Sequence, residues 1–419
     1  MTSSPRFDDH YDVLETRPQE VRERDLFWRL ADQIDHARAN APYFGRMLGD
    51  VTGRDVPDRG ALARLPVTRK SDLIALQKAT PPFAGMTGVP LGKLGRVFAS
   101  PGPIYDPQGD QPDPWRFGRA LYAAGFRAGS LVHNTFAYHF TPAGFMMDLA
   151  ARAIGCPVFP AGTGQTELQV QTIADLGPAY YAGTPSFLRI LLEKADEMKV
   201  DISSIRRAAV SGEAFLPPVR KLLADRGIAG FQSYGTADLG MVAYETEARE
   251  GLVVDEGVIV EIVRPGTGDP VPEGEVGEVV VTVLAPDYPL IRFATGDLSA
   301  LLPGASPCGR TNMRIRGWMG RADQTTKVKG MFVHPSQVAD VVKRHPEILK
   351  ARLTVTHDAD RNDVMTLACE TAPAAQDGLG IAVATSLRDV CKLRGEVRFV
   401  AAGSLPNDGK VIEDVRRYD

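Results

Sequence analysis

Residues 179–198 read AYYAGTPSFLRILLEKADEM, and this stretch decides the fold class. Its first four residues form a short apolar run, which is typical of a buried strand. Thr184 and Pro185 follow, a pair that suits a helix capped by threonine with proline in its first turn. The residues after Pro185 carry apolar side chains at helical spacing. A strand followed directly by a helix is the repeating unit of an α/β sheet with parallel strands.

The same alternation extends on both sides of this stretch. We expect helices over 115–128, 143–155, 167–176 and 186–198, and strands over 130–134, 156–159, 179–182 and 208–211. Before this region, residues 20–39 have the apolar spacing of an amphipathic helix. Residues 57–103 contain many Gly and Pro, so we expect them to be irregular.

The pattern changes at Gly251. Residues 252–263 and 275–284 are β-branched runs on either side of a turn rich in Pro, Gly and acidic residues, which predicts a β-rich subdomain. Further on, we expect strands over 351–356, 364–370 and 397–400, and helices over 336–344 and 381–393. The sequence therefore predicts a large N-terminal α/β domain with a β-rich subdomain, residues 1–322, and a small α+β domain, residues 323–419.

The charge balance argues against a nucleic-acid-binding protein. The 419 residues include 48 Lys and Arg against 52 Asp and Glu, whereas nucleic-acid binders usually carry a basic excess. Residues 1–10 contain no apolar signal core, and the most apolar stretch, 136–161, is interrupted by His139, Asp148 and Arg152. We therefore expect no nucleic-acid partner and no membrane attachment.

The four cysteines stand at isolated positions, and no pair has the CxxC spacing of a zinc knuckle or a redox motif. Isolated thiols in a chain of this length suit a reducing compartment. We expect a cytoplasmic protein whose thiols are buried and structural.

One segment combines four residue types that suit a nucleotide. Residues 233–238 read SYGTAD. A tyrosine can stack on a base, and a glycine lets the backbone approach a ligand. A threonine hydroxyl can hold a phosphate oxygen, and an aspartate can hold Mg²⁺ directly or through water. The alternative is a β-turn with a capping aspartate.

Three more segments could carry chemistry. Residues 292–298, RFATGDL, place an aspartate where it could accept two ribose hydroxyls, or simply in a turn. Residues 320–330 begin with GRAD and end with KVKG, and they form either an interdomain joint or a charged hairpin. Residues 405–410, LPNDGK, hold a lysine that either delivers a cation to a site or is a solvated tail residue.

Together, the order and spacing of these segments resemble the adenylate-forming superfamily of acyl-CoA synthetases, luciferases and adenylation domains. The phenylacetate–CoA ligase branch is the most similar, on four further stretches: LPVTRKSDL at 65–73, GTPSFL at 183–188, SGE at 211–213 and FVHPSQ at 332–337. The resemblance implies a small C-terminal domain that is mobile and carries a catalytic lysine.

The resemblance also implies a role for each matching residue. Lys410 would bridge the carboxylate and the α-phosphate, Thr236 would hold the α-phosphate, and Asp238 would bind Mg²⁺ where the family usually has glutamate. Asp323 would be the hinge, and Gly330 would face the CoA channel. The expected nucleotide-binding residues are Ser211, Gly212, Glu213, Tyr234, Gly235, Asp297 and Arg321.

The acyl pocket is expected at an aromatic segment. Phe136, Tyr138 and His139 fall where the family places an aromatic-lined pocket for the carboxylic acid, and aromatic side chains suit a flat aryl acid. The alternative is an aromatic core beneath a helix.

Two stretches depart from the family pattern. The family's phosphate loop is rich in Ser, Thr and Gly and ends in Lys-Pro, but residues 98–107 read FASPGPIYDP, with three prolines and no lysine. Proline donates no backbone N–H, and such loops hold phosphates largely through N–H groups. In addition, residues 243–249, AYETEAR, lack the Cys and His of a metal site that some members of the branch carry, so we expect no zinc there.

The resemblance thus predicts an acyl-CoA synthetase that uses ATP, Mg²⁺ and CoA to activate an aryl or arylacetic acid. Its partners would be small molecules: the carboxylic acid, ATP and CoA. A homodimer is compatible with the branch. Two alternatives stay open because of the atypical loop. The adenylate could pass to an amine, a hydroxyl or a carrier protein, or the chain could be a non-catalytic nucleotide- or acyl-binding homologue.

Overall fold

The computed structural model describes residues 10–100, 103–324, 326–329, 331–358, 363–372, 378–406 and 410–416, with the backbone alone for 323, 327, 331 and 332. The chain divides into two compact units. The large unit comprises Met1–Thr295 and Ser299–Trp318, and the small unit comprises Gly296–Leu298 and Met319–Asp419.

The described part of the large unit is built around a nine-stranded sheet with the order β14-β15-β10-β9-β8-β7-β6-β4-β5. Strands β5, β4, β6, β7 and β8 run parallel, and β8, β9, β10, β15 and β14 pair antiparallel. The bounds are β4 Val132–Asn134, β5 Val158–Pro160, β6 Tyr180–Gly183, β7 Arg207–Val210, β8 Ala229–Thr236, β9 Gly240–Tyr244, β10 Leu252–Val254, β14 Leu301–Leu302 and β15 Arg314–Ile315.

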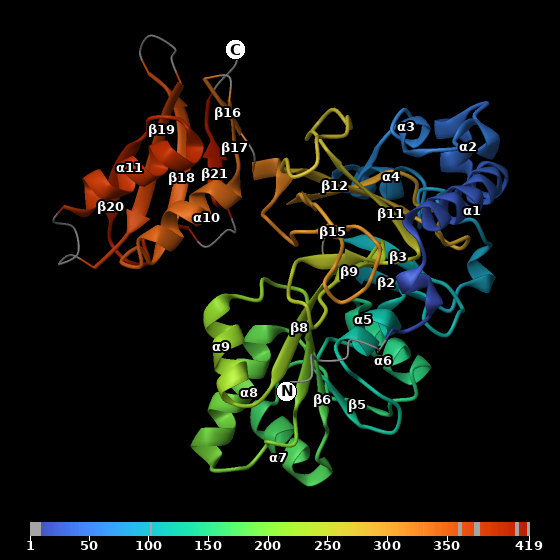
Figure 1. Cartoon of the computed structure of the whole chain (residues 1–419), viewed down its shortest axis with the longest axis horizontal. Helices are drawn as coiled ribbons and strands as arrows, with labels where there is room; N and C mark the ends of the chain where they lie inside the picture. Colours follow the sequence, from blue (N-terminus) through green and yellow to red (C-terminus); the bar gives the residue numbers. More distant parts are fainter. Residues whose placement is uncertain are drawn as a thin grey trace, which may run out of the picture. The chain divides into compact units, whose positions relative to one another are not determined.

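Helices cover both faces of the parallel strands, as Figure 1 shows. Successive strand residues point to opposite faces. Accordingly, Tyr180 and Ala182 pack into one cluster with α5 (Phe117–Ala123) and α6 (Ala143–Ala153). Tyr181 packs into a separate cluster with α8 (Pro185–Met198) and its neighbouring helices α7 (Thr166–Leu176) and α9 (Pro217–Asp225). The central parallel strands β4 and β6 are therefore buried on both sides.

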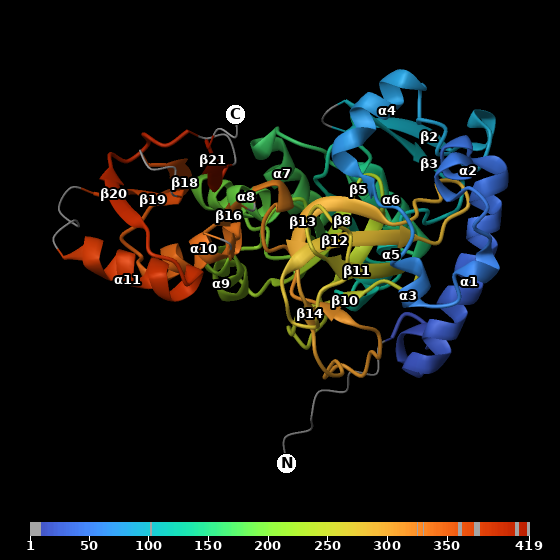
Figure 2. The same ribbon diagram turned by 90° about the horizontal axis from the view of Figure 1, so that it is seen from above.

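A four-stranded sheet with the order β1-β13-β12-β11 forms the second layer of the large unit (Figure 2). Its strands are β1 Thr68–Arg69, β11 Val258–Val263, β12 Gly277–Val283 and β13 Phe293–Ser299. Helices α1 (Gln19–Asn40), α2 (Pro42–Leu48) and α3 (Arg59–Leu62) share one apolar core with this sheet, in which Leu30 and Ile34 of α1 meet Val260 and Val281. Helix α4 spans Leu73–Ala79, and β2 (Arg96–Ser100) and β3 (Ile104–Gln108) form a hairpin.

The small unit has its own sheet, of order β20-β19-β18-β21, and its own core. Its strands are β18 Lys350–His357, β19 Asp363–Glu370, β20 Glu396–Val400 and β21 Ile412–Asp414, and β16 (Thr326–Val328) pairs with β17 (Met331–Val333). Val338 and Val341 of α10 (Pro335–Arg344) and Leu387 of α11 (Leu379–Cys391) are buried in this core.

The architecture confirms the predicted α/β fold class, and one local expectation is corrected. The β-branched run at 252–263 forms two strands, β10 and β11, with a turn between them. In this turn Asp255 accepts a hydrogen bond from the Gly257 N–H and pairs with Arg116. The stretch 57–103, expected to be irregular, contains short helices and strand β2. The domain boundary at residue 323 stays a prediction. The two compact units separate close to it, between Trp318 and Met319.

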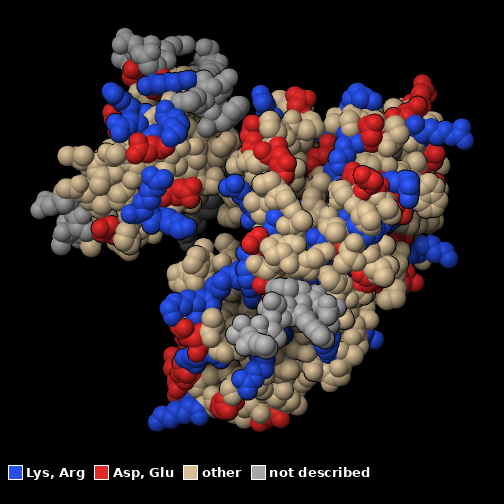
Figure 3. Space-filling model, viewed as in Figure 1, with Lys and Arg blue, Asp and Glu red and all other residues tan. Residues whose placement is uncertain are grey.

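The surface and the thiols complete the description. The four cysteines are buried and unbridged. Within the described residues, none of the helices combines the length and the apolar character needed to cross a bilayer. On the face shown in Figure 3, basic and acidic side chains are interspersed over the described residues, in keeping with the near balance of charges.

A buried arginine ties the loop before β1 to the second sheet. Arg292 is 2% exposed, and its guanidinium makes two hydrogen bonds of 3.0 Å to the carboxylate of Glu261. It also donates to the carbonyl oxygens of Ala63, Leu65 and Gly268. Burial raises the pKa of Glu261, and Arg292 opposes that rise. Arg292, the first residue of the RFATGDL segment, therefore has a structural role: it joins β11 to the loops on either side of it.

We predict that Arg292→Ala lowers the free energy of unfolding by about 3–5 kcal/mol, because it leaves the Glu261 carboxylate buried without its partner. Urea unfolding followed by circular dichroism measures the change. The matched control is Arg189→Ala, which removes an exposed pair with Glu193 and should cost less than about 1 kcal/mol. Equal losses in the two variants would contradict the structural role of Arg292.

Candidate active site

The predicted nucleotide-binding segments of the large unit come together at the carboxyl edge of the parallel strands. Ser211 follows β7 directly, and residues 234–236 end the neighbouring strand β8. The Ser211 hydroxyl donates a 2.9 Å hydrogen bond to the carbonyl oxygen of Ser233. In open α/β sheets, ligands bind at this edge of the strands. The geometry thus gathers segments that lie more than twenty residues apart in the sequence.

The SYGTAD segment is mostly strand rather than turn. Strand β8 continues through Thr236, with a register shift between Tyr234 and Gly235, and only the residues after Thr236 form the turn. Tyr234 is 9% exposed, and its hydroxyl donates to the Thr295 hydroxyl oxygen at 3.2 Å. A Cβ on Gly235 would lie 2.5 Å from the Gly240 carbonyl oxygen, so glycine is required there.

Gly212 and Glu213 lie beside the start of α8. Gly212 has φ +83°, a backbone conformation that favours glycine. Glu213 is exposed, and its Oε1 accepts a 2.7 Å hydrogen bond from the Ser186 N–H in the first turn of α8. Thr184 caps the same helix by accepting from the Phe187 N–H, as the sequence predicts.

The predicted acyl-pocket residues are only partly brought together. Phe136 is buried, and its ring lies 3.6 Å from where a Cβ on Gly212 would stand. The Tyr138 hydroxyl instead accepts from Asn134 at 2.7 Å and donates to Asp148 of α6 at 3.1 Å, and burial raises the pKa of Tyr138. His139 is exposed. Of the three predicted acyl-pocket residues, Phe136 therefore lies next to the carboxyl edge of the parallel strands.

Lys70 forms an ion pair with the predicted metal residue. Its Nζ lies 2.6 Å from Oδ2 of Asp238, whose side chain is fully buried. The Thr236 hydroxyl lies 3.4 Å from the same oxygen. Lys70 comes directly after β1 and belongs to the LPVTRKSDL stretch. The sequence analysis used that stretch only for the family resemblance. It did not predict that the lysine would form an ion pair with Asp238.

Asp106 adds a second buried carboxylate to this ion pair. It lies in β3, opposite Phe98 of the hairpin that carries the proline-rich loop, and it is 1% exposed. Burial, together with the nearby Asp238 carboxylate, raises the pKa of Asp106 to about 7. The available sequence signal was the loop itself, because residues 98–107 end in Asp106-Pro107 and contain no lysine.

The remaining predicted residues belong to the small unit. Arg321 Nη1 lies 3.1 Å from Asp297 Oδ1, and the two residues form an antiparallel bridge. Lys410 is half exposed, with its Nζ 3.4 Å from Glu413 Oε1. Asp323 lies in the 3₁₀ turn Ala322–Gln324, and Gly330 is outside the described residues. The structure thus pairs Asp297 with Arg321, and their roles stay predictions.

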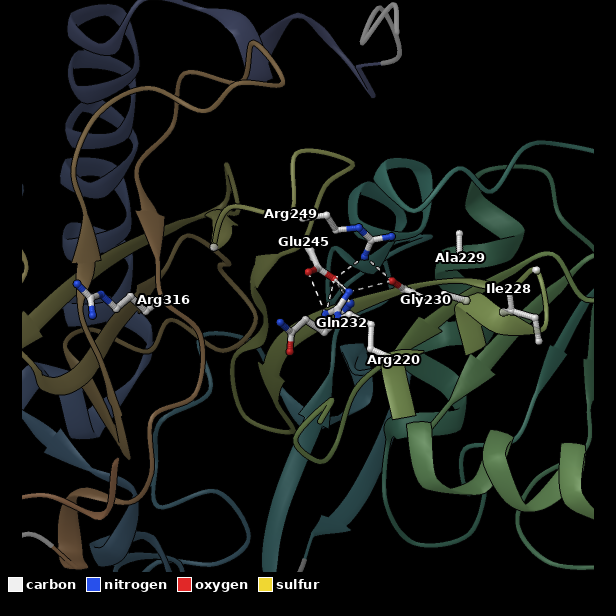
Figure 4. A pocket seen from close by; sticks show the side chains of 11 residues that line it. Arg220, Ile228, Ala229, Gly230, Gln232, Glu245, Arg249 and Arg316 are labelled. Carbon is white, nitrogen blue, oxygen red and sulfur yellow. Dashed lines mark hydrogen bonds and ion pairs between the residues drawn. The ribbon is translucent and has the colours of Figure 1, made fainter. Parts of the chain in front are cut away.

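A cavity of about 720 Å³ lies elsewhere, at the start of β8 (Figure 4). Glu245 projects into it between Arg220 and Arg249, with N–O distances of 3.0 and 2.9 Å. None of the predicted site residues lines this cavity. Glu245 belongs to the AYETEAR stretch, and no cluster of three or more His, Cys, Asp or Glu suited to a metal occurs among the described residues. This cavity is therefore separate from the candidate active site.

Comparison with known proteins identifies the family. The family of AMP-binding enzymes matches residues 119–283. The phenylacetate-coenzyme A ligase of Aromatoleum evansii is 31% identical over 368 residues, covering 84% of this chain and 82% of that protein. The enzyme of the same name from Thermus thermophilus is 32% identical over 353 residues, covering 80% and 78%. The chain belongs to the phenylacetate–CoA ligase family. The family resemblance predicted from the sequence is confirmed, and the protein is an AMP-forming carboxylate–CoA ligase.

Solved structures support the fold of this ligase. An open conformation of 2-hydroxyisobutyryl-CoA ligase, in complex with 2-HIB-AMP and CoA, matches with a TM-score of 0.83. The match covers 96% of this chain and 93% of that chain at 24% identity. The anthranilate CoA ligase AuaEII matches with a TM-score of 0.53 over 75% of this chain.

We predict that Lys70→Met lowers the free energy of unfolding by about 1–3 kcal/mol, because it leaves two facing carboxylates without an ammonium. Chemical denaturation measures the loss. Adding Asp106→Asn to this variant should restore part of the stability, since the second carboxylate is then neutral. An additive double variant would show that Asp106 and Lys70 do not interact.

Proposed function

We propose that this ligase activates an aryl or arylacetic acid as an acyl-adenylate and transfers the acyl group to CoA. The observation that carries the proposal is its similarity, over about four-fifths of its length, to enzymes named for phenylacetate. The convergence of Ser211, Gly212 and Tyr234 at the carboxyl edge supports it from the geometry. The buried ring of Phe136 beside Gly212 suits a flat acid.

In the first half-reaction, an oxygen of the carboxylate attacks the α-phosphorus of ATP, and the bond to pyrophosphate breaks. Two anions must approach each other, so positive charge near the reacting atoms is the main need of this step. We assign the ammonium of Lys410 to the carboxylate and α-phosphate, and the hydroxyl of Thr236 to an α-phosphate oxygen. Asp297 would accept the ribose hydroxyls, with Arg321 beside it.

The residues around Asp238 fit a Mg²⁺ ion. Among the described residues, Oδ1 of this buried carboxylate has no hydrogen-bond partner, and the Thr236 hydroxyl lies 3.4 Å from Oδ2. When bound, the ion would draw negative charge from the phosphate oxygens. The side chain of Asp238 is one methylene shorter than the glutamate usual in the family. It would therefore hold the ion closer to the backbone.

In the second half-reaction, the CoA thiolate attacks the acyl carbonyl carbon and AMP leaves. Lys410 is not needed once the adenylate exists. We further propose that the small domain turns about Asp323 and that Gly330 faces the channel for the CoA thiol. We place the reaction in the cytoplasm, which the four buried, unbridged thiols support.

A second candidate function follows from the proline-rich loop. Because this loop ends in Asp106-Pro107 and carries no lysine, the chain could use its adenylate differently and pass it to an amine, a hydroxyl or a carrier protein. Pyrophosphate release against a panel of aryl, arylacetic and short aliphatic acids tests the activation step. Mass spectrometry of the products with and without CoA tests the acceptor.

We predict that Asp297→Ala weakens AMP binding at least about tenfold, since each charged hydrogen bond to a ribose hydroxyl contributes ~1.5–3 kcal/mol. Isothermal titration calorimetry measures the dissociation constant. Asp389→Ala, at an exposed position of α11, is the control and should leave AMP binding unchanged. An unaltered affinity in Asp297→Ala would remove this residue from the nucleotide site.

We predict that Lys410→Ala slows adenylation about 10²–10³-fold, because it removes one electrostatic stabiliser from the transition state. Thioester formation from supplied acyl-adenylate should be largely retained. The two half-reactions are measured separately by pyrophosphate release and by CoA-thioester formation, with Lys343→Ala on α10 as the control. Equal losses in both half-reactions, without unfolding, would contradict the selective role.

A further inference from the structure

The cavity at the start of β8 is built by segments that lie far apart in the sequence. Its volume is about 720 Å³. The polar side chains of its walls are Arg220 from α9, Gln232 from β8, Glu245 and Arg249 from the stretch after β9, and Arg316 from the position after β15. All of these segments belong to the large unit, so the cavity lies within one compact body.

The polar groups in these walls are mainly hydrogen-bond donors. Glu245 is the acid of the described lining, and its carboxylate already accepts from Arg220, from Arg249 and from the Gln232 N–H. Among the described residues, no group bonds Nε or Nη2 of Arg249, the side-chain amide of Gln232 or the guanidinium of Arg316. A ligand that matches this cavity must therefore be rich in acceptor oxygens.

The lining also carries a surplus of positive charge. It holds three arginines against the single carboxylate of Glu245, a formal charge of +2, in a chain whose net charge is −4. Burial lowers the pKa of Arg249, and the neighbouring Arg220 adds to that shift while Glu245 opposes it. An anion beside the two guanidiniums would offset their mutual repulsion.

Arg220 and Arg249 are held in place before any ligand binds. The guanidinium of Arg249 lies 3.8 Å from the ring centroid of Phe231, and that of Arg220 lies 4.2 Å from the ring centroid of Phe215. The side chains of Arg220 and Arg249 nevertheless stay 32% and 33% exposed. Arg249 also has φ +57°, a conformation that few residues with a Cβ adopt and that concentrates at functional sites.

Arg316 stands across the cavity from this pair (Figure 4). In the figure its guanidinium points away from Glu245. Arg316 is exposed, and none of the described groups bonds its guanidinium, so the side chain is free to turn toward a bound anion. The two fixed guanidiniums thus form the core of the site, and Arg316 adds a movable charge.

We propose that this cavity binds a phosphate group, either as inorganic phosphate or as part of a phosphate ester. The planar guanidinium fork matches the oxygens of phosphate. A phosphate monoester carries a charge of about −1.5 to −2 at pH 7, which balances the lining, whereas one carboxylate would balance half of it. The cavity has the volume of roughly twenty waters, so it also has room for the organic part of an ester.

The inference does not rest on the proposed function. None of the described residues assigned above to the nucleotide, the metal ion or the carboxylic acid lines this cavity. CoA carries a phosphate monoester on its ribose, so it is the natural ester to test, and inorganic phosphate is the other source of the same chemistry. The phosphate site would remain if the acyl group passed to a different acceptor.

The experiment measures binding to the full chain in the absence of ATP and carboxylic acid. Inorganic phosphate is titrated at constant ionic strength and followed by phosphorus nuclear magnetic resonance. CoA and dephospho-CoA, which lacks the ribose phosphate, are titrated by calorimetry. The variants are Arg249→Gln, Arg249→Lys and Arg316→Gln. The matched control is Lys221→Gln, which removes an exposed charge of α9 outside the cavity.

These variants should fold. In the Arg249 variants the Glu245 carboxylate keeps Arg220 as a partner, and Arg316 is exposed. Melting temperatures check this expectation. Arg316→Gln provides the test that is least sensitive to stability, because none of the described groups bonds the side chain that it replaces.

We expect wild type to bind one inorganic phosphate per chain, or to bind CoA more tightly than dephospho-CoA. Arg249→Gln should weaken that binding at least about tenfold, because it removes charge-assisted hydrogen bonds. Arg249→Lys keeps the charge without the fork and should lie between the two. Arg316→Gln should weaken binding about two- to fivefold. Lys221→Gln should stay within about twofold of wild type.

The two sources of phosphate give different patterns. If the ester is the ligand, the cavity variants weaken CoA binding and leave dephospho-CoA binding unchanged. If inorganic phosphate is the ligand, they weaken phosphate binding and leave CoA binding unchanged. Either pattern supports a phosphate site.

Three results would overturn the inference. The first is a wild-type chain that shows neither phosphate binding at millimolar concentration nor a preference for CoA over dephospho-CoA. The second is wild-type affinity in both Arg249→Gln and Arg316→Gln, which would place the bound phosphate elsewhere. The third is an equal loss in Lys221→Gln, which would indicate unspecific attraction by charge. Pyrophosphate release is measured separately, so none of these results bears on the ligase activity.

Discussion

The carboxyl ends of parallel strands all lie along the same edge of the sheet. The candidate site of this ligase depends on that constraint. Helices pack on both faces of these strands and bury the central ones, so the carboxyl edge is where backbone and polar side chains become available for a ligand. Ser211 after β7 and Tyr234 within β8 meet there because their strands are neighbours. The second sheet adds Thr295, whose hydroxyl accepts the hydrogen bond of Tyr234.

Charge burial imposes a second constraint beside this edge. The buried carboxylate of Asp238 is paired with Lys70 at 2.6 Å, and burial together with the Asp238 charge raises the pKa of Asp106 to about 7. Lys70, which follows β1, therefore compensates a carboxylate that the turn after β8 buries.

Much of the fold could be predicted from the sequence, because its signals are local. The Thr184-Pro185 cap and the apolar spacing after it locate α8 to within one residue. Contacts between residues far apart in the sequence could not be predicted from such local signals. Nothing in the residues around Lys70 indicates that its ammonium meets Asp238, which lies 168 positions away. The turn at Asp255 was likewise missed, because its ion pair with Arg116 joins distant segments.

The measurement that most directly tests the central claim is product analysis of the full chain incubated with ATP, MgCl₂, CoA and phenylacetate or a related aryl acid. The account predicts that AMP, pyrophosphate and the acyl-CoA thioester form in equal amounts, and that none forms without the acid. Formation of ADP in place of AMP, or AMP and pyrophosphate without any thioester for every acid tested, would contradict it.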